Sequence, residues 1–585
     1  MSVTKYLAVV FLAIALASCS LPKSGVDLVL TNGKFDTIDP RLPEAQAVAV
    51  DGSRIVAVGT DSAIASRYIG RVTINLKKSF ILPGLIDGHC HMTDLGVMLT
   101  TLDLTQTRSA GAVAQMVAGA AARLGPGTWI RGRGWDQDLW SDREFPSHEI
   151  LDRAAPDNFV YLFRVDGHAI WVNKKVLQLA NITRDTKDPE GGRIVRDSEG
   201  NPTGVLLDAA RDLVAEVIPP PTDSEVEGAI LAAADTCARF GLTEVEDARV
   251  FQQTIRVYRK LFDERRLRIR VASMYYGMDS TLPELLKSGP IIDYDGFYTM
   301  RAVKIYMDGA LGSRGAALVQ SYSDDPGNFG LTEMGEKDLE NITIAALSNG
   351  FQVCTHAIGD RANHVALDAY QKALAVANVS DPRLRIEHAQ VLLKDDIPRF
   401  RELGVIPSMQ PAHCTSDMYW AEARLGPERI KRAYAWRSLL DDGNIIVGGS
   451  DFPAVSPDPR LGIYAAITRQ DLNGVPRDFE DAQKYFELSP DAAEDSSDFN
   501  GGFFPSQRMT LEEAIKSFTL WAAYGTFQEN EKGSISAGKL ADFSIFEKDF
   551  RTISPRDIPD DEVLATIVGG KLVYVNPSLK SWSAM

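Results

Sequence analysis

An apolar, strand-like run ends in two histidines in the stretch Leu82-Pro83-Gly84-Leu85-Ile86-Asp87-Gly88-His89-Cys90-His91. Alternate residues of a strand face the same way, so we expect His89 and His91 to point at one spot while Cys90 points away. Two imidazoles that point at one spot can supply two ligands of a metal site. A lone H-x-H pair is weak evidence, but this chain has only 8 histidines in 585 residues, and Pro-Gly punctuation precedes the pair.

The overall composition is that of a globular protein with more than one structural unit. A length of 585 residues exceeds the usual single domain, and hydrophobic and charged contents of 45% and 24% are ordinary. No internal apolar run approaches the ~20 residues that cross a bilayer. The net charge of −17, without any Lys/Arg run, argues against a nucleic-acid partner.

The first residues have the pattern of an export signal. Lys5 precedes an apolar run over 6–17 that is too short to span a membrane and ends in small residues. Leu16-Ala17-Ser18-Cys19 resembles the lipobox of bacterial lipoproteins, which implies a signal peptide over 1–18 and a lipidated Cys19. Ser20 then implies the outer membrane, with the protein in the cell envelope facing the periplasm or the surface and held by acyl chains alone. A plain secretory signal with a chance cysteine is the alternative.

The two ends of the chain predict one β-sandwich. Short alternating strands with Asn-Gly and Asp-Gly turn signals fill the segment 19–80, and complementary strand runs lie in 531–585. Between them, residues 81–530 alternate strand-like and helical runs, which predicts a parallel sheet covered by helices. The number of candidate strands, eight, predicts that the sheet closes into a (β/α)8 TIM barrel. The candidate strands are 81–87, 242–247, 267–276, 301–307, 351–356, 384–388, 405–410 and 445–451.

Barrel chemistry lies at the C-terminal strand ends, so polar residues that end apolar strands are site candidates. This test selects His89, His91, Lys304, His356, His388 and Asp451. Two segments do not fit a simple barrel. Residues 128–222, after the first strand, predict an inserted subdomain over the barrel mouth, and 478–507, rich in Asp, Ser, Gly and Phe, predict a lid or an exposed loop.

The combined motifs resemble the amidohydrolase superfamily of metal-dependent hydrolases, in the branch of YtcJ-like proteins and N-substituted formamide deformylases (amidohydrolase family 3). The resemblance covers nearly the whole mature chain. It rests on the opening stretch and on Gly134-Trp135-Asp136-Gln137, the motif 166–173, 304–316, Thr355-His356-Ala357-Ile358-Gly359-Asp360-Arg361-Ala362, Ile386-Glu387-His388-Ala389-Gln390, Gly449-Ser450-Asp451 and 538–542.

The resemblance implies a divalent metal, with zinc preferred, at one or two ions per chain. The implied ligands are His89, His91, Lys304, His356, His388 and Asp451. A free ammonium beside cations is unfavourable, so Lys304 is either carbamylated, which we prefer and which bridges two metals, or turned away. Asp451 would also be catalytic, because it can take a proton from metal-activated water and pass it to the leaving amine; a helix N-cap is the bland alternative.

Other residues carry weaker expectations. We expect His168, His413, Trp135 and Arg314 to contact substrate, with packing or solvent exposure as the alternatives. Cys90 departs from the family pattern, in which a small or hydroxyl residue is common; facing the barrel wall, it is not expected to bind metal.

The expected function is hydrolysis of a C–N bond in a small amide, formamide or cyclic amide. Two alternatives are kept: a deaminase or lactone/ester hydrolase on the same site, and a surface-anchored binding protein without turnover. The expected partners are a small-molecule substrate and the membrane through the lipid anchor; a homodimer is left open.

Overall fold

The computed structural model describes residues 23–165, 168–189, 191–488 and 496–579. The predicted signal peptide over 1–18 and Cys19 lie outside the described residues. Among the helices that are described, none combines the length and the apolar character needed to cross a membrane.

The central domain is the predicted (β/α)8 barrel. Its parallel sheet has the order β22-β21-β20-β19-β18-β16-β15-β8, with β17 (Ile291–Tyr294) attached to β18. The eight barrel strands are β8 (Leu85–Cys90), β15 (Leu242–Val250), β16 (Arg270–Tyr276), β18 (Tyr298–Tyr306), β19 (Gln352–Ala357), β20 (Arg385–His388), β21 (Ile406–Met409) and β22 (Val447–Gly448). Each of the eight predicted strands thus corresponds to one barrel strand.

Side-chain and backbone hydrogen bonds complete the barrel between its first and last strands. The Asp87 carboxylate accepts from the Ser450 backbone N at 3.0 Å and from Ser450 Oγ at 2.6 Å. The Asp451 backbone N donates to the His89 carbonyl at 2.7 Å. A side chain at Gly88 would meet the Gly448 carbonyl at 2.8 Å, so glycine permits this approach. Closure therefore brings His89 beside Asp451.

The opening stretch contains two strands rather than one. We predicted a single strand over 81–87, but β7 (Phe80–Pro83) ends at Pro83 and β8 begins at Leu85. The Gly84 backbone N donates to the Asp542 carbonyl, outside the barrel. Proline ends strand pairing because it has no N–H, so the chain crosses here from the sandwich into the barrel.

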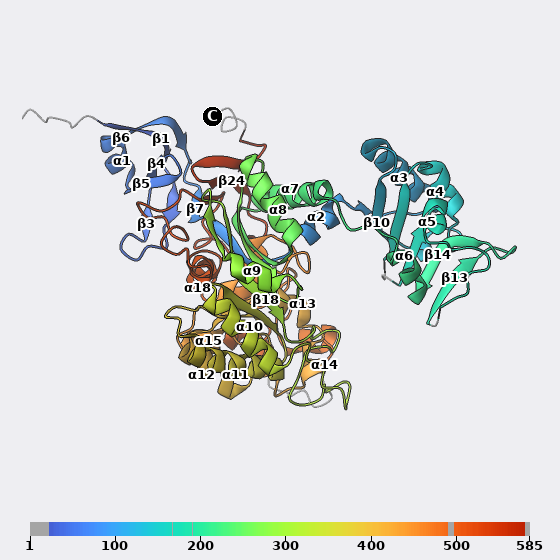
Figure 1. Ribbon diagram of the computed structural model, residues 1–585. Helices are drawn as coiled ribbons and strands as arrows, with labels where there is room; N and C mark the ends of the chain where they lie inside the picture. Colours follow the sequence, from blue (N-terminus) through green and yellow to red (C-terminus); the bar gives the residue numbers. More distant parts are fainter. Residues whose placement is uncertain (1–22, 166–167, 190, 489–495, 580–585) are drawn as a thin grey trace, which may run out of the picture.

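Both termini build the β-sandwich. One sheet has the order β5-β4-β1-β6, and the other joins N-terminal to C-terminal strands in the order β25-β24-β23-β7-β2-β3. A single apolar core lies between them, and Figure 1 shows the blue and red strands side by side. The strands are β1 (Ser24–Thr31), β2 (Lys34–Asp36), β3 (Glu44–Ala45), β4 (Ala47–Asp51), β5 (Arg54–Gly59), β6 (Tyr68–Asn75), β23 (Phe543–Phe546), β24 (Val563–Val568) and β25 (Lys571–Val575).

The insertion after the first barrel strand is larger than predicted and lies elsewhere. It includes β9 (Leu102–Asp103) and α3 (Ala110–Leu124), because Leu104, Val113 and Val117 pack in its core. Its two cores contain only residues between 102 and 218. Figure 1 shows it standing to one side, joined to the barrel near α2 (Met92–Thr100) and α7 (Asp223–Arg239). The expectation that it covers the barrel mouth is wrong.

The insertion has its own sheet, in the order β13-β14-β12-β11-β10-β9. Its strands β9, β10 (Trp129–Trp135) and β11 (Phe159–Arg164) are parallel. The remaining elements are β12 (Ala169–Val172), β13 (Gly192–Arg196), β14 (Pro202–Asp208), α4 (His148–Ala154), α5 (Lys174–Leu179) and α6 (Asp212–Ala215).

The described part of the segment 478–507 is anchored by buried phenylalanines, although Gln483, Lys484 and Tyr485 are exposed. It contains α17 (Phe479–Tyr485), and its phenylalanines pack against one another in tilted or T-shaped pairs with ring centroids 4.8–6.1 Å apart. Phe503 is fully buried and Phe504 nearly so. Residues 489–495 lie outside the described residues. Aromatic burial therefore anchors a segment that is exposed in part, and its role as a lid stays a prediction.

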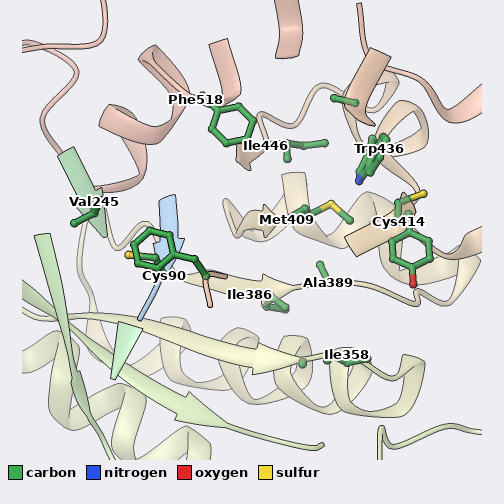
Figure 2. Packing of buried hydrophobic residues seen from close by; sticks show 14 of the residues in the cluster. Cys90, Val245, Ile358, Ile386, Ala389, Met409, Cys414, Trp436, Ile446 and Phe518 are labelled. Atoms are coloured by element: carbon green, nitrogen blue, oxygen red, sulfur yellow. The ribbon is translucent and has the colours of Figure 1, made fainter. Parts of the chain in front are cut away.

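An apolar layer separates the barrel strands from the covering helices. Figure 2 shows Cys90, Val245, Ile386 and Phe518 in this layer. Cys90 is fully buried, and its thiol donates to the Glu246 carbonyl. As strand alternation predicts, Cys90 faces away from the side on which its neighbours His89 and His91 lie.

Candidate metal centre

The site begins with His89, whose ring is fixed from behind. His89 is fully buried, and its Nδ1 lies 2.5 Å from Glu387 Oε2. Although burial raises the pKa of Glu387, the charges of Arg385 and His89 hold it well below its usual value. An ionised carboxylate can only accept, so Nδ1 carries the proton and Nε2 is left as an acceptor. This Nε2 lies 3.1 Å from Lys304 Nζ, and both residues line the cavity.

His388 is fixed in the same way from another strand. Its Nδ1 lies 2.7 Å from Gln410 Oε1. Strand alternation would place His388 opposite Glu387, but the backbone turns at His388, where φ is 74°, and at Ala389, where φ is 42°. These left-handed conformations at the end of β20 bring the imidazole into the cavity beside His356, whose ring centroid is 4.5 Å away.

Asp451 stands between two groups of imidazoles. Its Oδ1 lies 3.1 Å from His91 Nε2 and 3.6 Å from His89 Nε2, and its Oδ2 lies 3.9 Å from His413 Nε2. Two sets of ligand-type atoms, each within 4.8 Å of one another, share this carboxylate: His89, His91, Asp451 and His388, His413, Asp451. Asp451 itself adopts a left-handed backbone, with φ of 58°. A carboxylate between two such sets can ligate one cation or two.

His356 supplies a test of whether the site suits a metal. Its Nε2 is buried and has no hydrogen-bond partner, since Asp308 Oδ1 lies 3.6 Å away, and burial lowers the pKa of the ring to about 3. A neutral imidazole nitrogen left without a partner in the interior is unfavourable unless a ligand completes it. Imidazoles and a carboxylate are donors that zinc and other divalent cations accept. The residues present therefore fit a metal centre.

Lys304 lies at the floor of the same cavity. It is fully buried, and its Nζ is 3.1 Å from His89 Nε2. Burial lowers the pKa of its ammonium to about 8, against the attraction of Glu387 and Asp451. The described residues offer Lys304 no carboxylate within ion-pair distance, so its amine is chemically available at the site.

A cavity of about 370 Å³ opens above these groups at the C-terminal ends of the barrel strands. Besides the histidines, Lys304 and Asp451, its lining includes Tyr306, Leu311, Ile358, Gln390, Asp417 and Trp420. A small molecule can therefore approach the converging imidazoles from the barrel mouth.

Comparison with known proteins agrees with this geometry. Residues 72–574 match the model of the amidohydrolase family. The chain belongs to this family. It is 34% identical to the protein LONG AFTER FAR-RED 3 of Arabidopsis thaliana, over 94% of this chain and 93% of that protein. It is 32% identical to YtcJ of Bacillus subtilis (strain 168), which is named as an amidohydrolase, over 90% and 96%.

Two further matches concern chemistry and fold. The N-substituted formamide deformylase of Arthrobacter pascens is 26% identical, over 94% of this chain and 98% of that enzyme. An uncharacterised metal-dependent hydrolase from Pyrococcus furiosus superposes with a TM-score of 0.71 at 26% identity, covering 89% of this chain and 99% of that one. This amidohydrolase is thus a metal-dependent hydrolase with a TIM barrel, as the motifs predicted.

The structure brings all six predicted ligands of this amidohydrolase to one cavity, together with His413. It does not bring the other three predicted substrate contacts there. Trp135 is buried in the insertion core, His168 is exposed and hydrogen-bonded to Asp208, and Arg314 pairs with Asp324. The roles of these three residues in substrate binding stay predictions from the sequence.

Sequence reasoning missed several residues that had a detectable signal. Tyr306 follows Lys304 by two residues on one strand, and Asp417 follows His413 by four on α13 (Pro411–Asp417). Both spacings place residues on a common face. Glu387 gave a weaker signal, because the turn at His388 brings two consecutive residues of β20 to the same site.

Proposed function

We propose that this amidohydrolase hydrolyses the C–N bond of a small amide, formamide or cyclic amide, giving a carboxylic acid and an amine. The convergence of imidazole nitrogens on Asp451, with His89 and His388 held by Glu387 and Gln410 in the tautomer that leaves Nε2 unprotonated, is the observation that supports the proposal. The name of the formamide deformylase of Arthrobacter pascens supports this substrate class.

His89, His91, His356, His388 and Asp451 would hold the metal, for which zinc is our preference because imidazole suits it. A divalent cation in such a site polarises the substrate carbonyl and lowers the pKa of water toward ~7. Glu387 and Gln410 hold the His89 and His388 rings in the tautomer that ligation requires. The two sets that share Asp451 support occupancy by one or two ions.

Asp451 would move the proton. Its carboxylate accepts a proton from the water that attacks the carbonyl carbon, and then donates it to the amine nitrogen as the C–N bond breaks. His91, 3.1 Å away, and the left-handed backbone at Asp451 keep the carboxylate oriented toward the cavity. The atoms balance, because one water supplies the hydroxyl of the acid and the hydrogen of the amine.

Lys304 would be carbamylated, with its amine adding to CO2 and releasing a proton. A buried ammonium without a carboxylate partner is costly, whereas a carbamate anion beside cations is stabilised. Intact-mass spectrometry under CO2 should show the mass of one added CO2, which the Lys304→Met variant lacks. If the wild type never gains it, Lys304 remains a free amine and the site is expected to hold one metal.

A substrate panel tests the function. N-formyl amines, N-acyl amino acids, hydantoins, aminopurines and lactones are each incubated with metal-loaded protein, and release of the acid or amine is measured. Turnover of amides or formamides supports the proposal. Turnover of lactones or aminopurines alone would establish the esterase or deaminase alternative, and metal binding without turnover would establish a binding protein.

We also propose that Cys19 anchors the protein to the cell envelope through lipid, on the sequence 16–19 alone. In a bacterial host, the wild type should fractionate with outer membranes and the Cys19→Ser variant should not. Equal distribution of the two would reject the anchor.

A further inference from the structure

The lining of the cavity above the metal centre combines apolar side chains with one carboxylate besides Asp451. The apolar part is formed by aromatic and aliphatic residues, Tyr306, Leu311, Ile358 and Trp420, and the carboxylate is that of Asp417. Lys304 is the only lysine or arginine among the described residues of the lining, and it lies against His89. A positively charged group on a substrate could therefore pair with the Asp417 carboxylate above the floor of the cavity.

Asp417 is held on the same helix face as His413. Residues four apart lie one above the other on a helix, so Asp417 stands about one turn, roughly 5.4 Å, beyond His413. His413 is one of the imidazoles beside Asp451, with its Nε2 3.9 Å from Asp451 Oδ2. This position places Asp417 within reach of the far end of a molecule whose scissile bond lies at the metal centre.

The carboxylate is oriented by neighbours that leave part of it available. Its Oδ2 accepts from Tyr434 Oη at 2.8 Å and from Gln390 Nε2 at 3.2 Å. Its Oδ1 lies 3.0 Å from Ser416 Oγ, but this hydroxyl also reaches the His413 carbonyl at 3.0 Å. One hydroxyl has one proton, so Oδ1 keeps at least one free acceptor position.

The position of the Asp417 carboxylate does not favour the stability of the fold. It is the last residue of α13, where the helix dipole disfavours a negative charge. Among the described residues, no lysine or arginine forms an ion pair with it. An oriented, partly exposed carboxylate without a cation, facing a cavity, is the kind of local conflict that functional sites retain.

We propose that Asp417 is a specificity-determining residue that binds a protonated amine on the substrate. The preferred substrates are then amides or formamides whose substituent ends in an ammonium group and whose alkyl part contacts the apolar lining residues Leu311, Ile358 and Trp420. Amides that end in a carboxylate, including N-acyl amino acids, are disfavoured. This inference rests on the proposed function, since it names the substrate class of the same site.

Three formamides of similar length test it: N-formylputrescine, N-pentylformamide and N-formyl-γ-aminobutyrate, which end in an ammonium, a methyl and a carboxylate. We expect the wild type to prefer the first. The Asp417→Asn change should raise KM for N-formylputrescine roughly 10- to 100-fold through loss of a charge-assisted contact, and alter values for N-pentylformamide less than about threefold. Asp417→Glu, which keeps the charge, should retain the preference.

The matched control is Glu422→Gln, which removes a buried carboxylate on the next helix, α14 (Ala421–Leu425), and does not line the cavity. It should leave the preference unchanged. The inference is overturned if Asp417→Asn changes all three substrates alike, or if the wild type prefers the methyl or carboxylate end.

Calorimetric binding separates this inference from the proposed function. Putrescine and pentylamine are titrated into metal-loaded wild type and into Asp417→Asn, with Glu422→Gln as control. If no formamide is hydrolysed but putrescine binding weakens at least tenfold in Asp417→Asn alone, the function fails and the inference stands. If putrescine and pentylamine bind alike to both proteins, the inference fails whatever the turnover.

Discussion

The barrel and the insertion both contain parallel strands, but only the barrel gathers the residues at its strand ends around one cavity. In both, parallel strands end in polar residues. In the barrel the strand ends form a ring, so His89, Lys304 and Asp451 face one cavity. In the insertion the sheet is open, and its strand-end residues instead pair among themselves, as Arg164 does with Asp136 and Asp138.

Burial separates the two regions further. His89 is fully buried with its ring fixed by Glu387, whereas the His168 side chain is 74% exposed beside Asp208. A buried polar group must be satisfied by a partner, while an exposed one is satisfied by water. Polar strand ends therefore indicate a metal centre only where the sheet closes and excludes water.

The largest expected effect separates histidines of the two regions. His89→Ala removes a ligand-type nitrogen at the core of the centre, and we expect loss of bound metal and a fall in kcat/KM of roughly 10³-fold or more. His148→Ala, in the insertion, should keep both. Metal per chain is measured by plasma mass spectrometry. Equal metal content in the two variants would show that the cation binds elsewhere.

The separate cores of the insertion predict separate unfolding. Trp171 is fully buried there, and Trp171→Ala should destabilise the insertion by about 3–5 kcal/mol. Calorimetry of the wild type should show more than one transition, of which the variant lowers only one, with metal content unchanged. Phe518→Ala, in the layer beneath the barrel helices, should lower the other. A single transition shifted by both changes would contradict the independence of the cores.

Much of the barrel was predictable because apolar strands and polar strand ends repeat along the chain. The six predicted ligands reach one cavity for that reason, since closure of a parallel sheet fixes where strand ends lie. The crossing at Pro83 was missed because the same apolar run serves two sheets, and only pairing partners distant in the sequence divide it.

Placement of the insertion could not be predicted from local pattern. Its motif around Trp135 has the same appearance as a site motif, but the indole packs against Trp140 and Trp171 in a closed core. Whether the side chains of this motif reach the barrel cavity or pack in the core of the insertion depends on tertiary packing over the whole of 102–218. The left-handed backbone at His388 and Asp451 has only a weak signal in residue type, because His and Asp are enriched in that conformation but only a small fraction of them adopt it.

A pair of carboxylate–histidine contacts sharpens the comparison. Glu387→Gln should weaken metal affinity roughly 10- to 100-fold, because the His89 ring loses its fixed tautomer. Asp152→Asn removes the matching contact to His148 in the insertion, where Nδ1 and Oδ2 are 2.6 Å apart, and should leave affinity unchanged. Competition with a chelator measures both. An unchanged affinity in Glu387→Gln would show that His89 needs no support from behind.

The smallest expected effect concerns the pH dependence of stability. Burial raises the pKa of Glu422 to about 7, with repulsion from Asp498 adding to it. A carboxyl whose pKa is higher in the folded state stabilises the fold only while protonated there, so this contribution is present below about pH 4.5 and lost as the pH rises through 7.

Glu422→Gln removes this penalty and should therefore stabilise the protein by about 2 kcal/mol more at pH 8 than at pH 5. Glu199→Gln, at an exposed carboxylate of the insertion, should show no such difference. Denaturant unfolding of both variants and the wild type at the two pH values measures it. If Glu422→Gln were equally stabilising at both, packing rather than ionisation would explain its effect, and the contrast between buried and exposed carboxylates would not extend beyond the metal centre.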